Sequence, residues 1–338
     1  MTRSSNKLAS KYVWNRRLLR VALAFCVAAG LFCHAQINPN RVAQLHWYQA
    51  NTTATIPIPS QSYAQPFTLA FDGANVWAGS SARGILTKVR ASDGAVLLTL
   101  ALPDSIGTLT IFGMAFDGVN IWASMGNPYG QGGDYVAKVR ASDGALIGAF
   151  SVGNQAQGLV FDGASIWVAN SLDSTIDKLR VDTGDIVSVF SVPAYPTSMT
   201  YDGANIWVIV NYFGGVTKMR AADGAILGTF AVAGTPYGIT YDGSNIWTAN
   251  FSGQSATKLR ASDGSLLGTY PAGTGNPISL VFDGTNIWVA NNTGSTVVEL
   301  RASDGTLLNT VGGQSHPQGM AFDGSNIWVA NRSFLSKL

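Results

Sequence analysis

Glutamate is almost absent from this sequence of 338 residues, in which Glu299 stands alone beside 18 aspartates. Charged residues make up 12% of the chain, about half of the usual share. Long solvated helices depend on glutamate and lysine, so this composition argues against a helical protein. A formal net charge of +2 gives no sign of a nucleic-acid binder. With 46% hydrophobic residues and 38 glycines, the chain is expected to be a turn-rich, all-β protein.

Cysteine and histidine are too scarce to carry much chemistry. Cys26 and Cys33 both lie near the N-terminus, and the only histidines are His34, His46 and His316. A disulfide framework is therefore excluded for the rest of the chain, and a histidine-based metal site is restricted. No Gly-x-Ser-x-Gly motif supports a catalytic triad. We expect no cofactor and no metal, although Asp173 and Asp177 could ligate calcium without resembling an EF-hand loop.

Residues 1–35 have the pattern of a secretory signal peptide. Six basic residues and no acidic residue occupy the first 20 positions, and an uncharged apolar run follows from Val21 to Phe32. That run is shorter than the roughly 20 residues that a membrane helix needs. The small residues Cys33 and Ala35 suit cleavage before Gln36. An uncleaved anchor is the alternative.

Export changes the expected location and charge of the protein. Removing six cations and no acid leaves 15 basic and 19 acidic residues, a formal charge of −4. The mature chain is expected in the periplasm or outside the cell, with no membrane anchor after cleavage. Residues 36–50 would form an N-terminal lead segment, and residues 51–338 the folded domain.

A repeat dominates the rest of the chain. The string Phe/Tyr-Asp-Gly-x-x-Ile/Val-Trp occurs seven times, at intervals of 40 to 45 residues. Its tryptophans are Trp77, Trp122, Trp167, Trp207, Trp247, Trp288 and Trp328. Each unit contains four short β segments, A to D, with Asp-Gly turns joining A to B and C to D. Seven such units predict a seven-bladed β-propeller, with a solenoid as the alternative.

The ends of the repeat predict how the ring closes. The seventh unit stops at Leu338, inside its third segment, so its fourth strand is missing. The β-like run from Thr52 to Ile58 precedes the first unit and can supply that strand. Such pairing would remove an exposed sheet edge. Pro57 and Pro59 fit an outermost strand, where one side needs no ladder partner.

The repeats resemble bacterial YVTN-repeat propellers, which are similar to NHL-type propellers. Trp-Val-Ala-Asn at Trp167–Asn170, Trp288–Asn291 and Trp328–Asn331, and Trp-Thr-Ala-Asn at Trp247–Asn250, stand where that family has its naming tetrapeptide. The likeness covers residues 50–338 and implies the fold, which hosts many activities. Streptogramin lyases, also seven-bladed propellers, are the nearest enzymes in fold. Their chemistry uses a histidine and acidic residues with a divalent metal.

Most charges repeat with the blades and therefore belong to the scaffold. Thirteen of the 18 aspartates lie in the A/B and C/D turns. Strand C carries a Lys-x-Arg pair in five units, such as Lys88 and Arg90, on one face of the strand. We interpret these cations as surface charge that pairs with nearby turn aspartates, and a track for a polyanion as the alternative. The repeated tryptophan is expected to pack between the sheets.

Differences between the repeats locate a candidate site. All length changes fall in the D/A connections and B/C loops, which emerge on one face of an up-and-down sheet, and such variable loops commonly build binding sites. Two insertions, Pro103–Thr110 and Gly126–Tyr135, belong to blade two. They predict a raised lip carrying Asp104, Asn127, Tyr129, Gln131, Asp134 and Tyr135.

Two further rings of residues are expected at the mouth of the ring. The position six before the Phe or Tyr of strand A holds Gln65, Thr110, Gln155, Tyr195, Thr235, Asn276 and His316. The position four before it holds Phe67, Phe112, Gln157, Thr197, Tyr237, Ile278 and Gln318. Amides and aromatic rings with almost no charge suit a neutral polar ligand, a glycan or a peptide.

The sequence therefore predicts an exported, monomeric binding propeller. Its ligand-binding candidates are Asp104, Asn127, Tyr129, Asp134, Tyr135, Gln155, Gln157, Tyr195, Tyr237, Asn276, His316 and Gln318. The partner is a glycan, peptide or protein, and no nucleic acid is expected. The alternative is a lyase or hydrolase that uses His316 as its acid or base, because that histidine is expected at the mouth.

Overall fold

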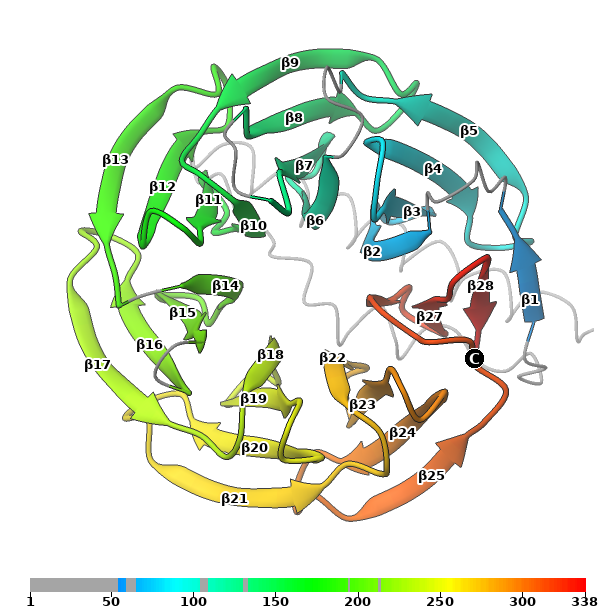
Figure 1. The fold of residues 1–338 in the computed structure, drawn as a ribbon, viewed down its shortest axis with the longest axis vertical. Helices are drawn as coiled ribbons and strands as arrows, with labels where there is room; N and C mark the ends of the chain where they lie inside the picture. The colour runs from blue at the N-terminus through cyan, green and yellow to red at the C-terminus, as the bar shows by residue number, and fades with distance from the viewer. Residues whose placement is uncertain (1–53, 59–64, 104–108, 130–132, 194, 212–213) are drawn as a thin grey trace, which may run out of the picture. The chain divides into compact units, whose positions relative to one another are not determined.

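Seven four-stranded antiparallel sheets surround a central axis in the computed structural model, which describes residues 54–58, 65–103, 109–129, 133–193, 195–211 and 214–338 (Figure 1). The expected all-β, seven-bladed β-propeller is confirmed. In each blade strand A lies nearest the axis and strand D lies at the rim (Figure 1). Among these residues, no helix has the length and apolar character needed to cross a membrane.

The strands follow the chain in regular order. Strand A of blades one to seven is β2 (Pro66–Phe71), β6 (Thr110–Phe116), β10 (Ala156–Phe161), β14 (Pro196–Tyr201), β18 (Pro236–Tyr241), β22 (Pro277–Phe282) and β26 (Met320–Phe322). Strand B is β3 (Asn75–Ser80), β7 (Asn120–Gly126), β11 (Ser165–Asn170), β15 (Asn205–Val210), β19 (Asn245–Asn250), β23 (Asn286–Asn291) and β27 (Ile327–Ala330). Strand C is β4 (Ile85–Arg90), β8 (Tyr135–Arg140), β12 (Thr175–Arg180), β16 (Gly215–Arg220), β20 (Ser255–Arg260), β24 (Thr296–Arg301) and β28 (Phe334–Lys337). Strand D is β5 (Val96–Ala101), β9 (Leu146–Ser151), β13 (Ile186–Ser191), β17 (Ile226–Ala231), β21 (Leu266–Pro271), β25 (Leu307–Val311) and, in blade seven, β1 (Ala54–Pro57).

The ring closes as the sequence predicts. Strand β1 pairs antiparallel with β28, with Ala54 opposite Lys337 and Pro57 opposite Phe334. It is the outermost strand of its sheet, which is where proline is tolerated in a sheet. Ile56 is buried in a cluster that also contains Trp328 of blade seven and Val89 of blade one. The first described strand therefore seals the junction between the last blade and the first.

The A/B turn and the repeated tryptophan form one unit. In blade one, Asp72 Oδ1 accepts the backbone N–H groups of Ala74 and Asn75 at 2.9 and 2.7 Å. Asp72 Oδ2 accepts the indole N–H of Trp77 at 2.8 Å. The corresponding indole bonds in blades two to seven are 2.7 to 2.8 Å long. The aspartate thus closes the hairpin and satisfies the one polar atom of a buried ring.

The interpretation of the strand-C lysines as surface charge is wrong, although Lys178 does lie 4.0 Å from the turn aspartate Asp162. Lys88 is only 7% exposed, its Nζ lies 5.3 Å from the Trp77 ring centroid, and it donates to Ala141 O of the next blade at 2.6 Å. The lysines at positions 138, 178, 218, 258 and 337 donate equivalent hydrogen bonds to backbone carbonyl oxygens of the next blade. The arginines behave as expected, because Arg90 pairs with Asp93 at 2.8 Å on the surface. The lysine ammonium therefore joins neighbouring blades.

Glu299 interrupts this series of lysines. It occupies the lysine position of blade six and accepts Asn286 Nδ2 at 2.7 Å. Trp288, which it faces across the ladder, is only partly buried, whereas the other six repeated tryptophans are fully buried. Burial and the nearby Asp283 carboxylate raise the pKa of Glu299. The sixth blade therefore lacks the lysine bond to its successor.

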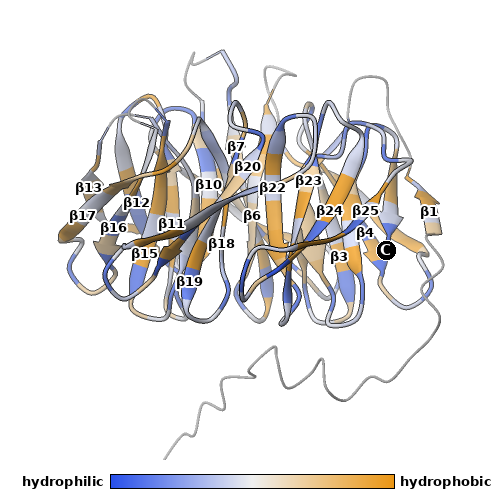
Figure 2. Ribbon diagram, turned by 90° about the horizontal axis from the view of Figure 1, so that it is seen from below, coloured by the Kyte–Doolittle hydropathy of each residue, from blue (hydrophilic) through white to orange (hydrophobic). Residues whose placement is uncertain are grey.

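Hydrophobic residues fill the spaces between the blades. In Figure 2 they lie along the strands, while the turns on the two faces are mainly hydrophilic. Aromatic residues of strand D cover the tryptophans, as in the stacked pair of Trp167 and Phe190 with ring centroids 5.4 Å apart. Near the axis, a Cβ on Gly158 would come within 2.1 Å of Thr197 O in the next blade. The small residues of strand A therefore let adjacent innermost strands approach closely.

Candidate functional site

The D/A connections and B/C loops meet on one face of the ring. In every blade except the second, a backbone N–H just after strand B bonds to the segment that enters strand A among the described residues. For example, Ser171 N donates to Gln155 O at 3.0 Å, and Asn211 N donates to Tyr195 O at 3.2 Å. These bonds attach the variable loops to the mouth of the ring, so the loops are held by the rigid strands of the same blade.

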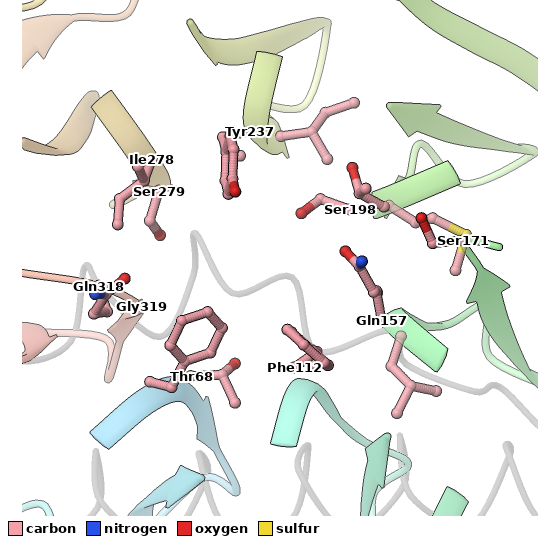
Figure 3. A pocket seen from close by; sticks show the side chains of 18 of the residues that line it. Thr68, Phe112, Gln157, Ser171, Ser198, Tyr237, Ile278, Ser279, Gln318 and Gly319 are labelled. Atoms are coloured by element: carbon pink, nitrogen blue, oxygen red, sulfur yellow. The ribbon is translucent and has the colours of Figure 1, made fainter. Parts of the chain in front are cut away.

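A cavity of about 590 Å³ opens at this mouth. It contains all seven side chains of the ring predicted four positions before the strand-A Phe or Tyr: Phe67, Phe112, Gln157, Thr197, Tyr237, Ile278 and Gln318. In Figure 3, Phe112, Gln157 and Tyr237 point into the opening from three different blades. None of the described lining residues is Asp, Glu, Lys, Arg or His. The cavity is therefore lined by aromatic, amide and hydroxyl groups without formal charge.

Fewer cavity-lining residues come from the second predicted set, which lies six positions before the Phe or Tyr of strand A. Only Gln155 and Tyr195 from this set line the cavity. Both have a left-handed backbone, with φ of 56° and 58°, as does His316 with φ of 49°. Such φ values are uncommon for residues other than glycine and cost of order 1 kcal/mol or more. The surrounding strands hold these residues in this conformation and so fix the direction in which the side chains leave the backbone.

The other described candidates are not among the residues that line the cavity. Asn127, Tyr129, Asp134, Tyr135, Asn276 and His316 do not line it, and Asp104 and Gln131 are outside the described residues. Pro128, from the second blade-two insertion, does line it, although sequence reasoning missed this residue. The only available signal was its position inside an insertion beside the mouth.

Several residues of the predicted lip are used within the fold. Tyr135 donates its hydroxyl to Pro103 O, which joins the two blade-two insertions. Asn127 is 1% exposed, and its Oδ1 accepts the backbone N–H of Tyr129 at 2.9 Å. Asp134 Oδ1 accepts Asn127 N at 2.7 Å. Tyr129 itself is 73% exposed, so it is the described lip residue most available to solvent.

Three carboxylates surround the connection that enters blade three. Asp177 accepts Gly153 N at 3.2 Å, Asp173 accepts Asn154 N at 2.7 Å, and Asp134 accepts Gln155 N. Burial raises the pKa of both Asp134 and Asp177, and the negative charge of Asp173 adds to it. The carboxylates thus satisfy three consecutive backbone donors just before the cavity wall begins.

These acids do not form a metal site in the described part of the chain. No group of three or more His, Cys, Asp or Glu side chains there is placed to hold a metal ion. Asp173 and Asp177, the calcium candidates, instead accept the backbone N–H groups of the blade-three connection. The observed bonds therefore assign them to holding that loop.

Two polar atoms of the cavity wall lack a partner. Thr197 Oγ1 and Asn211 Oδ1 are buried and accept or donate no hydrogen bond among the described residues. Buried polar atoms without partners are rare in folded proteins. Both atoms belong to blade four, next to the amides of blade three.

No family model and no curated protein matches this sequence. Solved structures do match in fold. A streptogramin B lyase structure superimposes with a TM-score of 0.71 and 17% identity, covering 85% of this chain and 96% of that chain. A catalytically inactive histidine-to-alanine variant of virginiamycin B lyase from Staphylococcus aureus with quinupristin gives 0.69 and 18%, covering 85% and 98%. The structure of U3-55K gives 0.71 and 11%, covering 86% and 99%. At these identities, the chain is similar to these proteins in its propeller fold alone.

Proposed function

We propose that this protein is an exported binding module that holds a neutral polar ligand in the cavity at the mouth of its variable-loop face. The observation that carries this proposal is the lining itself, which combines Tyr195, Tyr237, Gln157 and Gln318 with no charged residue. Ionic ligands gain affinity from charged partners in a site, whereas neutral ligands rely on apolar contact and hydrogen bonds. The cavity volume of about 590 Å³ is in the range of small-molecule sites.

Export is part of the proposal and is supported by the N-terminal sequence. Six basic residues followed by the apolar run from Val21 to Phe32 have the order of a signal peptide. The Trp-Val-Ala-Asn tetrapeptides support membership of the YVTN-repeat group of bacterial propellers. Fractionation of cells expressing the full chain, with mass determination of the product, tests cleavage before Gln36. If the protein stays in the cytosol with residues 1–35 still attached, the export part of the proposal is wrong.

A binding screen tests the function itself. The protein lacking residues 1–35 is applied to arrays of neutral glycans and neutral peptides, beside a double variant, Tyr195→Ala with Tyr237→Ala. Leu266→Ala serves as the control, because Leu266 is an exposed residue of strand β21 on the outer wall. We expect hits that the double variant loses and the control keeps. Equal binding by the double variant would move the site elsewhere.

A lyase is the second candidate, favoured by the fold likeness to streptogramin B lyases. His316 is the acid or base it would need, but it does not line the cavity. Incubation with quinupristin, followed by mass spectrometry, tests this candidate directly. We expect quinupristin to remain intact. If the parent protein cleaves quinupristin and the His316→Ala variant does not, the protein is a lyase and the proposed binding function is wrong.

A further inference from the structure

The cavity wall has apolar and hydrogen-bonding sectors. Phe67 and Phe112, from blades one and two, form an edge-to-face pair with ring centroids 5.8 Å apart and an interplanar angle of 87°. Blades three and four present amide and hydroxyl groups instead, from Gln157, Ser171 and Asn211. A ligand that fills the cavity therefore meets apolar rings on one side and a row of donors and acceptors on another (Figure 3).

Two tyrosines at the cavity leave part of their surface open to a ligand. Tyr237 is 47% exposed and packs against Phe251, with ring centroids 5.4 Å apart at 33°. Tyr195 is 43% exposed, and the bond from Asn211 N to its carbonyl holds its left-handed backbone. Rings that are already ordered lose little conformational freedom when a ligand stacks on them.

The hydrogen-bonding sector suits a ligand that carries hydroxyl groups. A hydroxyl has one donor and two acceptor lone pairs, so it can bond the amide and hydroxyl side chains that line this part of the cavity. Side-chain amides such as Gln157 can in turn bond two neighbouring hydroxyls at once, through the carbonyl oxygen and the NH₂ group.

We infer that the ligand of this cavity is an uncharged oligosaccharide of two or three units, an inference that rests on the proposed binding function. A pyranose ring combines an apolar face of C–H groups, which stacks on aromatic rings, with an edge of hydroxyls and no charge. That chemistry matches the tyrosines, the amide and hydroxyl sector and the uncharged lining. A peptide fits less well, because each residue brings a backbone N–H and C=O that both need partners.

Calorimetric titration of the protein lacking residues 1–35 distinguishes the ligand classes. The probes are di- and trisaccharides of glucose, mannose, galactose and N-acetylglucosamine, trigalacturonate as a carboxylated trisaccharide, and terminally blocked tetrapeptides of Gly, Ser, Asn and Gln. We expect at least one neutral oligosaccharide to bind and trigalacturonate to bind about tenfold more weakly or not at all, since burying its charge without a partner is costly.

Matched variants then locate the binding. Tyr237→Ala should weaken affinity about tenfold or more, while Tyr237→Phe, which keeps the stacking ring, should stay within about threefold. Gln157→Leu removes the amide at similar volume and should also weaken binding about tenfold. Thermal melting confirms that each variant folds, and Leu266→Ala should bind like the parent.

The outcomes separate this inference from the proposed function. Binding of the blocked peptides with no bound oligosaccharide would overturn the carbohydrate assignment and leave the binding function standing. Stronger binding of trigalacturonate than of its neutral counterpart would also overturn the assignment. If no probe binds and the array screen also finds no ligand, both the carbohydrate assignment and the proposed binding function are wrong. Oligosaccharide binding that Tyr237→Ala does not change would place the site outside the cavity.

Discussion

Asp134 of blade two accepts the backbone N–H of Gln155, a cavity residue of blade three. The same carboxylate accepts Asn127 N within its own loop at 2.7 Å. The blade-two insertion is therefore bonded to the entry of the neighbouring innermost strand. Because Gln155 also has a left-handed backbone, this bond helps to hold a strained residue at the mouth.

Loss of the Asp134 carboxylate is expected to loosen that junction. Asp134→Ala would leave buried backbone donors without an acceptor, which costs about 2 kcal/mol or more. Urea denaturation of parent and variant measures the change in the free energy of unfolding. Asp143→Ala is the control, since Asp143 lies in an exposed C/D turn and should have a much smaller effect. Equal effects of the two substitutions would contradict the role assigned to Asp134.

Asp177 is expected to make stability depend on pH in the direction opposite to most turn aspartates. Burial raises its pKa in the folded state, so the folded protein holds the proton more tightly than the unfolded chain does. This group's contribution to stability is therefore lost as the pH rises from its ordinary pKa through the raised one. Asp177→Asn should increase the urea midpoint at neutral pH, and the gain should shrink as the pH falls below the raised pKa.

Asp263 provides the control of opposite sign for that measurement. Hydrogen bonds from Ser265 and Arg260 lower the pKa of Asp263 to about 2. Its contribution is present above the ordinary pKa and lost as the pH falls toward 2. Asp263→Asn should therefore decrease the midpoint at neutral pH. A decrease for Asp177→Asn as well would show that the Asp177 charge is stabilising and refute the prediction.

The strand-C lysines are expected to contribute more to stability than the neighbouring arginines. Lys258→Met keeps the apolar stem but leaves Ala302 O and Ser303 O without the ammonium donor, at a cost of about 1–3 kcal/mol. Arg260→Met removes only an exposed ion pair with Asp263 and should change the unfolding free energy far less. Chemical denaturation of both variants gives the comparison. A larger loss for Arg260→Met would contradict the assignment of the inter-blade bond to lysine.

Close approach of the innermost strands makes a further test possible. Gly158→Ala would place a methyl group 2.1 Å from Thr197 O, so we expect a loss of about 1–3 kcal/mol. Gly312→Ala is the matched control, because nothing lies within 4 Å of a Cβ there. Thermal and urea unfolding of the two variants measure the difference. A neutral result for Gly158→Ala would mean that adjacent blades can separate near the axis without cost.

The fold could be predicted almost completely from local patterns. The Asp-Gly turns and the spacing of tryptophans such as Trp77 and Trp122 define each blade, because hairpin chemistry lies within a few residues. The β-like run from Thr52 to Ile58 also predicted the strand that closes the ring, and β1 lies within it. The role of Lys88 could not be predicted in this way, since its acceptor Ala141 O belongs to the next blade.

The candidate site was predictable where strand register decides it. Residues four before the strand-A aromatic, such as Gln157 and Tyr237, all line the cavity because each strand presents the same position to the axis. Loop residues do not follow such a rule. Asp134 and Asn127 were expected on an exposed lip, but the insertion folds back and uses their polar atoms internally. Only tertiary contacts reveal that.

The pairing of β1 with β28 also has consequences for the order of folding. Blades one to six consist of strands that are consecutive in the chain, so their hairpins form from local contacts and are expected to form fast. Blade seven joins the first and last described strands, and pairings between residues so far apart in the sequence form more slowly than hairpins do. Ring closure should therefore come late. Until it occurs, both strands have open edges that other copies can pair with, so refolding yield should fall as protein concentration rises.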